Sequence, residues 1–162
     1  TTFYDEFAGK DDCLFAAYDD VIEGSLARVR AAYEQGERWP DRIRLGLEVL
    51  LGDLARSPAV ARMATIELPA AGPEAYRHYR TAVESFVPFF AEGREFAGPS
   101  ADLPPSVEVM SVGGAEAIIF DEVIGERTEA LSELMPEILF AILCPYLGPE
   151  AASEEMREAT PA

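Results

Sequence analysis

Apolar side chains recur every three or four residues along most of this 162-residue chain, which is the spacing of one face of an α-helix. Proline and glycine interrupt the pattern, and both residues mark helix ends. No stretch alternates apolar and polar residues over the length of a strand. The pattern therefore predicts an all-α fold. Pro88 lies inside one predicted helix, where we expect a kink. The expected helices cover residues 10–34, 39 through at least 54, 57–68, 73–96, 104–126 and 135–147.

The last two predicted helices, 104–126 and 135–147, have almost no polar face. A helix that is apolar all round must be covered all round, and a small monomer has few helices with which to do so. The economical solution is a second copy, in which two helices from each subunit form an isologous four-helix interface. The glycine pair at 113–114 would let helices approach closely at its middle. The residues assigned to this homodimer interface are Val112, Gly113, Ile119, Ile138, Ile142 and Tyr146.

The composition is that of a single globular domain, with 49% apolar residues and a mean hydropathy near zero. The longest apolar run, 138–147, is too short to cross a bilayer, so no membrane partner is expected. No secretion signal is present, and two distant cysteines are typical of reduced thiols in the cytoplasm. The net charge of −17 repels the phosphate backbone, so this chain by itself is not expected to bind nucleic acid.

Catalytic motifs are missing from the sequence. His78 is the single histidine, and it falls on a polar helix side between two arginines. The sequence has no zinc-ligand spacing, no second histidine for a di-metal carboxylate site and no phosphate-binding glycine loop with its lysine. We therefore assign no catalytic residue, no metal and no cofactor, and we expect a binding protein rather than an enzyme.

A ligand pocket between helices is the binding site that this pattern favours, because such pockets are mostly apolar with a few polar groups. The helices over 57–68, 73–96 and 104–126 offer methionine and aromatic walls. An aromatic stripe at helical spacing is more often ordinary core packing than a pocket, and this alternative stays open. The candidate ligand-binding residues are Met63, Glu67, Tyr79, Val83, Phe86, Phe90, Met110, Ala117 and Phe120.

Three acids near these walls have two interpretations. Glu67 ends the 57–68 helix, while Glu116 and Asp121 interrupt the apolar 104–126 helix. A buried carboxylate is costly unless it is paired, so each could bind a cationic ligand or an arginine across a dimer. If exposed, each simply marks the solvated face.

The first residues carry the most specific motif. Thr2-Phe3-Tyr4-Asp5-Glu6-Phe7 is followed by a small turn, Ala8-Gly9, and then by Lys10-Asp11-Asp12. This segment resembles the end of the recognition helix in the TetR family of transcriptional regulators. Glu6 departs from the family pattern, which has histidine or tyrosine there. The resemblance implies DNA-backbone contacts from Thr2, Tyr4 and Lys10.

The resemblance also implies a domain layout and a fold. Residues 1–9 would be the end of a helix-turn-helix whose other helices are absent. Residues 10–150 would be a ligand-binding and dimerisation domain, followed by an acidic C-terminal tail over 151–162. The fold would be a TetR-type C-terminal helical bundle whose last two long helices form a dimeric four-helix interface.

The function that follows is a ligand-responsive transcriptional regulator, expected to be a repressor. A small apolar or aromatic effector would bind in the helical domain and release operator DNA, which is held through the N-terminal domain. The signal would run through the helix that begins at Lys10. The alternative from another class is a helical dimerisation or protein-interaction module that has no small-molecule effector.

Overall fold

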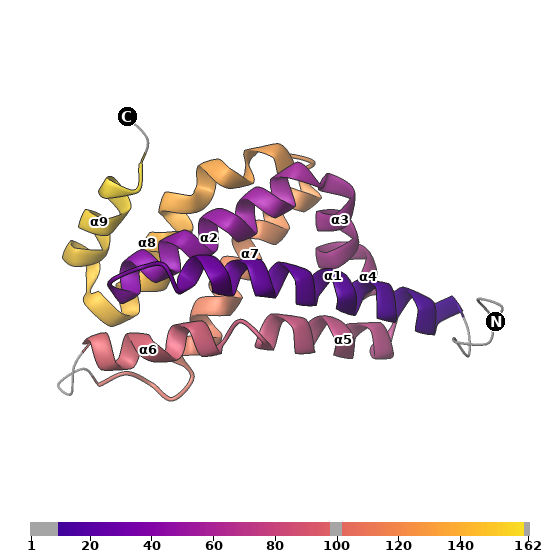
Figure 1. Cartoon of the computed structure of the whole chain (residues 1–162), viewed down its shortest axis with the longest axis horizontal. Helices are drawn as coiled ribbons and strands as arrows, with labels where there is room; N and C mark the ends of the chain where they lie inside the picture. Colours follow the sequence, from indigo (N-terminus) through magenta and orange to yellow (C-terminus); the bar gives the residue numbers. More distant parts are fainter. Residues whose placement is uncertain (1–9, 98–101, 161–162) are drawn as a thin grey trace.

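A computed structural model describes residues 10–97 and 102–160, and every regular element in these ranges is helical (Figure 1). The expectation of an all-α protein is confirmed in this described part. The elements are α1 (Lys10–Tyr33), α2 (Trp39–Arg56), α3 (Pro58–Arg62), the π-helix η2 (Met63–Glu67), α4 (Leu68–Ala70), α5 (Pro73–Glu84), α6 (Pro88–Ala97), α7 (Val107–Ile124), the 3-10 helix η3 (Thr128–Leu134), α8 (Met135–Leu147) and α9 (Pro149–Glu158).

Prolines set most of the helix boundaries. Several helices begin with proline at one of their first two positions, where its missing N–H removes no helical hydrogen bond. Pro88 does more than kink the predicted 73–96 helix, because it starts a separate helix, α6, after a short turn. Pro69 does not end the preceding helical segment, which continues through the π-helix to Ala70.

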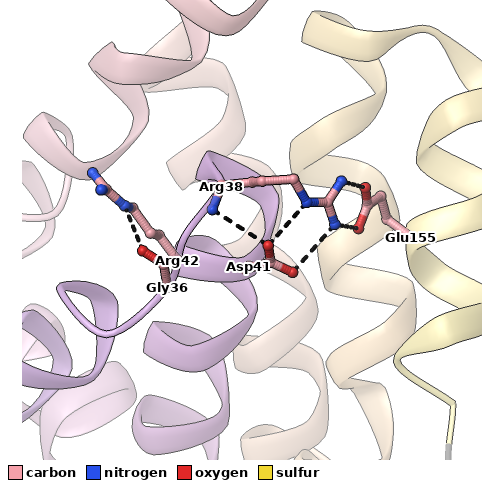
Figure 2. Close-up of polar contacts among 5 residues, drawn as sticks. All are labelled: Gly36, Arg38, Asp41, Arg42 and Glu155. Carbon is pink, nitrogen blue, oxygen red and sulfur yellow. Dashed lines mark hydrogen bonds and ion pairs between the residues drawn. The ribbon is translucent and has the colours of Figure 1, made fainter.

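The long helix α1 packs along α2, and α5 and α6 lie beneath it in the view of Figure 1. The α1–α2 connection turns sharply at Gly36, where a Cβ atom would lie 2.6 Å from the backbone nitrogen of Arg42. The Arg42 Nε donates to the Gly36 carbonyl at 3.0 Å and closes the turn (Figure 2). Trp39, at the start of α2, is 1% exposed and donates its indole N–H to the Phe89 carbonyl at 3.1 Å.

Helix α8 lies at the centre of the core. Ile138, Leu139, Ile142 and Leu143 are all at most 1% exposed, and Tyr146 is 5% exposed. Their cover comes from α2, α6, α7, η3 and α9, all of which contact α8. Ile138, Ile142 and Tyr146, which we assigned to a dimer interface, are therefore core residues of the monomer in this structure. The expectation that one chain has too few helices to cover α8 did not allow for η3 and α9.

The stretch from Thr128 to Leu147 is long and apolar enough, by length and composition, to cross a membrane. It is longer than the uninterrupted apolar run 138–147, whose length was the basis for expecting no membrane-spanning helix. The stretch combines η3 and α8, whose most apolar residues lie in the protein core. Packing of a central helix is thus sufficient to account for its hydropathy.

The segment expected to be an acidic tail is mostly helix α9, which packs back onto α8. Ala152 is completely buried in this contact. Arg38 then ties α9 to the start of α2: its guanidinium donates to both oxygens of Glu155, at 2.8 and 3.2 Å, and to Asp41 at 3.0 Å (Figure 2). A two-pronged arginine–carboxylate contact is stronger and more directional than a single ion pair.

We expect Arg38→Ala to lower the free energy of unfolding by about 1 kcal/mol, because it removes a paired contact between distant helices. The matched control is Arg44→Ala, which breaks an exposed pair with Glu48 inside α2 and should cost about 0.3 kcal/mol. Urea denaturation of both variants measures the difference. Equal losses would show that the Arg38–Glu155 contact contributes no more than a surface pair.

Candidate functional site

A cavity of about 350 Å³ lies between α1, α2, α3, α5 and α7. Aliphatic and aromatic side chains form most of its wall, so it offers an apolar space with a few polar groups. Its volume is within the range typical of small-molecule sites. Representative lining residues from these five helices and from the turn after α5 are Tyr18, Val29, Leu47, Val60, Val83, Phe86, Ala115 and Ile119.

Four of the predicted ligand-binding residues line this cavity: Tyr79, Val83, Phe86 and Phe90. They lie on α5, on α6 and in the turn between them, so the break at Pro88 bends the chain around one side of the space. Whether they bind a ligand remains a prediction. The alternative interpretation also holds for part of the set, because Tyr79 and Phe90 are buried core residues as well.

Helix α7 faces the cavity with a different set of residues from the one predicted. Val112, Ala115, Glu116 and Ile119 line the cavity. Met110 and Phe120 point outward, with exposed fractions of 63% and 37%, and Gly113 and Ala117 are exposed on the same side. Met110, Ala117 and Phe120 are therefore not pocket residues here, and Val112 and Ile119 are not on an outer face. Apolar residues occur on every side of α7, and its acids do not mark the solvent face, because Glu108 is buried and Glu116 lines the cavity.

The π-helix explains why Glu67 misses the cavity. Val60 and Ala64 line the space, and regular α-helical spacing would bring residue 67 to the same face. The i→i+5 bonds of η2 wind the chain less per residue, which rotates Glu67 away. Glu67 is exposed and accepts from Arg62 Nε at 3.1 Å. Met63 is half-buried and does not line the cavity. It packs against a cluster of buried residues from α1, η2, α4 and α5: Phe15, Tyr18, Ala64, Leu68, Ala75, Tyr79 and Ala82.

Glu116 supplies a carboxylate to the cavity wall, close to Tyr18 and Tyr79. The Tyr79 hydroxyl donates to Glu116 Oε1, and Arg80 Nη1 lies 3.9 Å from Oε2. Burial raises the pKa of Glu116 above its usual range. Burial, together with the charges of Asp19 and Glu116, raises the pKa of Tyr18 to about 12, so its hydroxyl stays protonated. This part of the cavity offers two phenol groups beside one carboxylate.

Two other polar groups near the cavity are already paired. Tyr33, which lines the cavity, donates to Glu92 Oε2 at 2.7 Å, and Arg42 Nη1 lies 3.0 Å from each oxygen of Glu92. Asp53 accepts from Arg28 at 2.8 Å and also from Arg56. Both of these arginines are largely exposed, so this ion-pair cluster marks the solvent side of the cavity.

The remaining candidate residues lie elsewhere. His78 is outside the cavity, where its Nδ1 lies 3.2 Å from Asp19 Oδ1 and its ring stacks on Phe15 at 4.4 Å. In the described residues no group of three histidine, cysteine or acidic side chains is placed to hold a metal ion. Thr2 and Tyr4 lie outside the described residues, and Lys10 begins α1.

Sequence reasoning assigned no pocket role to α1 or α2, although both supply much of the wall. Tyr18, Val29 and Leu47 lie at the helical spacing of buried faces. A face that packs on another helix and a face that lines a cavity have the same apolar spacing, so no signal in the sequence separates them. Comparison of the chain with protein-family models, with curated proteins and with solved structures gave no match.

We expect Glu116→Gln to raise the free energy of unfolding at neutral pH. The folded protein holds the Glu116 pKa above its ordinary value of 4.5, so the native state favours the neutral form and loses that stability as pH rises through the raised pKa. Glutamine is neutral throughout, and the advantage of the variant should vanish below pH 4.5. Thermal unfolding across this pH range measures it.

Glu122→Gln is the control on the same helix and should have the opposite sign. The Arg127 guanidinium holds the pKa of Glu122 below its usual range, so the charged carboxylate stabilises the native state above the ordinary pKa. Removing that charge should destabilise the protein at neutral pH, with the loss disappearing in acid. If both variants shift in the same direction, burial is not the source of the Glu116 effect.

Proposed function

We propose that the chain is the sensor and dimerisation part of a TetR-type, ligand-responsive transcriptional regulator, expected to be a repressor. The observation that carries the proposal is the position of α1. This helix begins at Lys10, directly after the segment that resembles the end of a TetR recognition helix, and it forms one wall of the cavity. A molecule in the cavity would therefore touch the helix that leads to the DNA-reading segment.

The effector would be a small molecule with an apolar or aromatic body. The cavity is of suitable size, and its lining is dominated by aliphatic and aromatic side chains. A ligand that prefers one position of α1 changes the spacing of two recognition helices in a dimer. That spacing must match one DNA turn, so the ligand weakens DNA binding by its differential affinity for the two states.

The homodimer would form through the outward face of α7. Val109, Met110 and Ile124 are 51%, 63% and 53% exposed on this helix, which is a large apolar exposure for one element. A methyl group at Gly113 or Gly114 would meet no described atom within 4 Å, so a second helix can approach closely there. Of the residues assigned to the interface from the sequence, Gly113 stays in the proposed interface. Met110, Ala117 and Phe120, which were assigned to the pocket, now belong to the proposed interface.

Blocking the cavity should abolish ligand binding without affecting the dimer. Ala115 faces the cavity and is 8% exposed, so Ala115→Phe places a ring where the ligand would lie. A ligand at one hundred times its Kd stabilises the wild type by about 2.7 kcal/mol, and the variant should lose that gain. Thermal shift against a panel of apolar and aromatic compounds measures it. If no compound stabilises the wild type, the alternative of an effector-free interaction module is favoured.

Ala117→Glu, two residues along the same helix, should have the converse effect. It places a charge on the exposed apolar face and should turn a dimer into a monomer at micromolar concentration, with ligand binding intact. Analytical ultracentrifugation reports the mass. Ala27→Glu on the exposed side of α1 is the control and should stay dimeric. A monomeric wild type would contradict the proposed dimer.

Operator release tests the regulatory part of the proposal. DNA fragments selected by the regulator carrying its helix-turn-helix should dissociate when a compound identified by thermal shift is added. Fluorescence anisotropy of the labelled DNA measures the change in affinity, expected to be about five-fold or more. A compound that binds the cavity and leaves DNA affinity unchanged would show that the cavity is not coupled to the DNA-reading segment.

A further inference from the structure

Glu116 differs from the other carboxylates near the cavity in lacking a close cationic partner among the described residues. Asp53 is held by Arg28 at 2.8 Å and also by Arg56, and Glu92 is held by Arg42 at 3.0 Å. The cation nearest to Glu116 is Arg80, whose Nη1 is 3.9 Å from Oε2.

Arg80 is also shared with another acid, because its Nη2 lies 3.4 Å from Glu84. Glu116 Oε1 accepts the Tyr79 hydroxyl, which satisfies one oxygen of the carboxylate. The second oxygen, Oε2, is therefore paired only weakly, with an arginine that is 3.9 Å away and also contacts Glu84. The Glu116 side chain is 29% exposed and lies on the cavity wall, so the carboxylate is accessible from the cavity.

The surroundings of Glu116 suit a cation better than an anion. Tyr18 and Tyr79 flank it in the cavity, and the faces of aromatic rings attract ammonium groups. Asp19 adds negative charge close to Tyr18. The whole chain carries a net charge of −17, which raises the local concentration of cations around the protein and lowers that of anions. At the solvent side, Arg28 and Arg56 share the single acid Asp53, so that cluster carries a net positive charge and the negative charge of the cavity wall lies at Glu116.

We propose that the cavity takes an organic cation, an apolar or aromatic body with one ammonium group that pairs with Glu116 between Tyr18 and Tyr79. This inference rests on the proposed function, since it names the chemical class of effector for the same cavity. The apolar body would lie against Val83, Phe86 and Ile119, and the ammonium would complete the partially paired carboxylate.

Three probes with the same apolar body and different head groups test the charge: phenylbutylamine, phenylbutanol and phenylbutyrate. Isothermal titration calorimetry at neutral pH should show the amine binding at least ten-fold more tightly than the alcohol, with the carboxylate weakest. Glu116→Gln should weaken amine binding about ten-fold and leave alcohol binding unchanged. Circular dichroism confirms that the variant is folded.

Glu122→Gln is the matched control, because it removes one negative charge from the same helix outside the cavity. It should leave amine binding unchanged, which separates a local contact from the effect of net charge. Equal binding of all three probes, or an amine affinity that does not respond to Glu116→Gln, would overturn the cation inference and leave the apolar cavity standing. Binding by none of the probes, with no response in the wider thermal-shift panel, would overturn both the inference and the proposed function.

Discussion

The structure depends on how one strongly apolar helix is covered. Helix α8 has a single charged residue, Glu137, which is exposed together with Ala141 and Pro145. The rest of its surface is apolar and is stable in water only when other elements cover it. The chain does this with five of its own elements, including α9, which the Arg38–Glu155 contact ties to α2. Because α8 uses one side of α7 for its own cover, α7 divides its apolar surface between the interior and the outside. The cavity and the exposed apolar face both follow from that division.

The two faces of α7 are separated by the width of a single helix. Ala115 faces the cavity and Ala117 faces outward, so a ligand and a partner subunit would press on the same backbone from opposite sides. Two sites on one rigid element are coupled whenever each prefers a different position of that element. The same argument applies to α1, which borders the cavity along much of its length. A ligand in the cavity that displaced α7 would act directly on the proposed dimer interface. One that displaced α1 would act directly on the helix that leads to the DNA-reading segment.

Helix positions followed from the sequence because proline, glycine and helical spacing are local signals, and α8 matches its predicted range of 135–147. The orientation of α7 about its axis did not follow, since it has apolar residues on every side and two of its acids, Glu108 and Glu116, lie on the inward side rather than in solvent. Glu67 was misplaced because a π-helix leaves no clear trace in sequence spacing. The sequence predicts an acidic tail where α9 lies, because the composition is acidic and the residues that hold it are few: Ala152 is completely buried and Glu155 pairs with Arg38.

The fold by itself does not explain why Glu116 lies on the cavity wall. An apolar side chain at that position would extend the wall formed by its neighbours Val112, Ala115 and Ile119, and it would avoid the cost of burying a carboxylate. The native state instead holds a half-paired acid against two tyrosines. Groups that disfavour folding in this way are concentrated at functional sites, where the binding partner supplies the missing interaction. The free-energy cost of burying the Glu116 carboxylate therefore indicates the part of the cavity that would select a ligand by its charge. The apolar walls would select a ligand only by its size and shape.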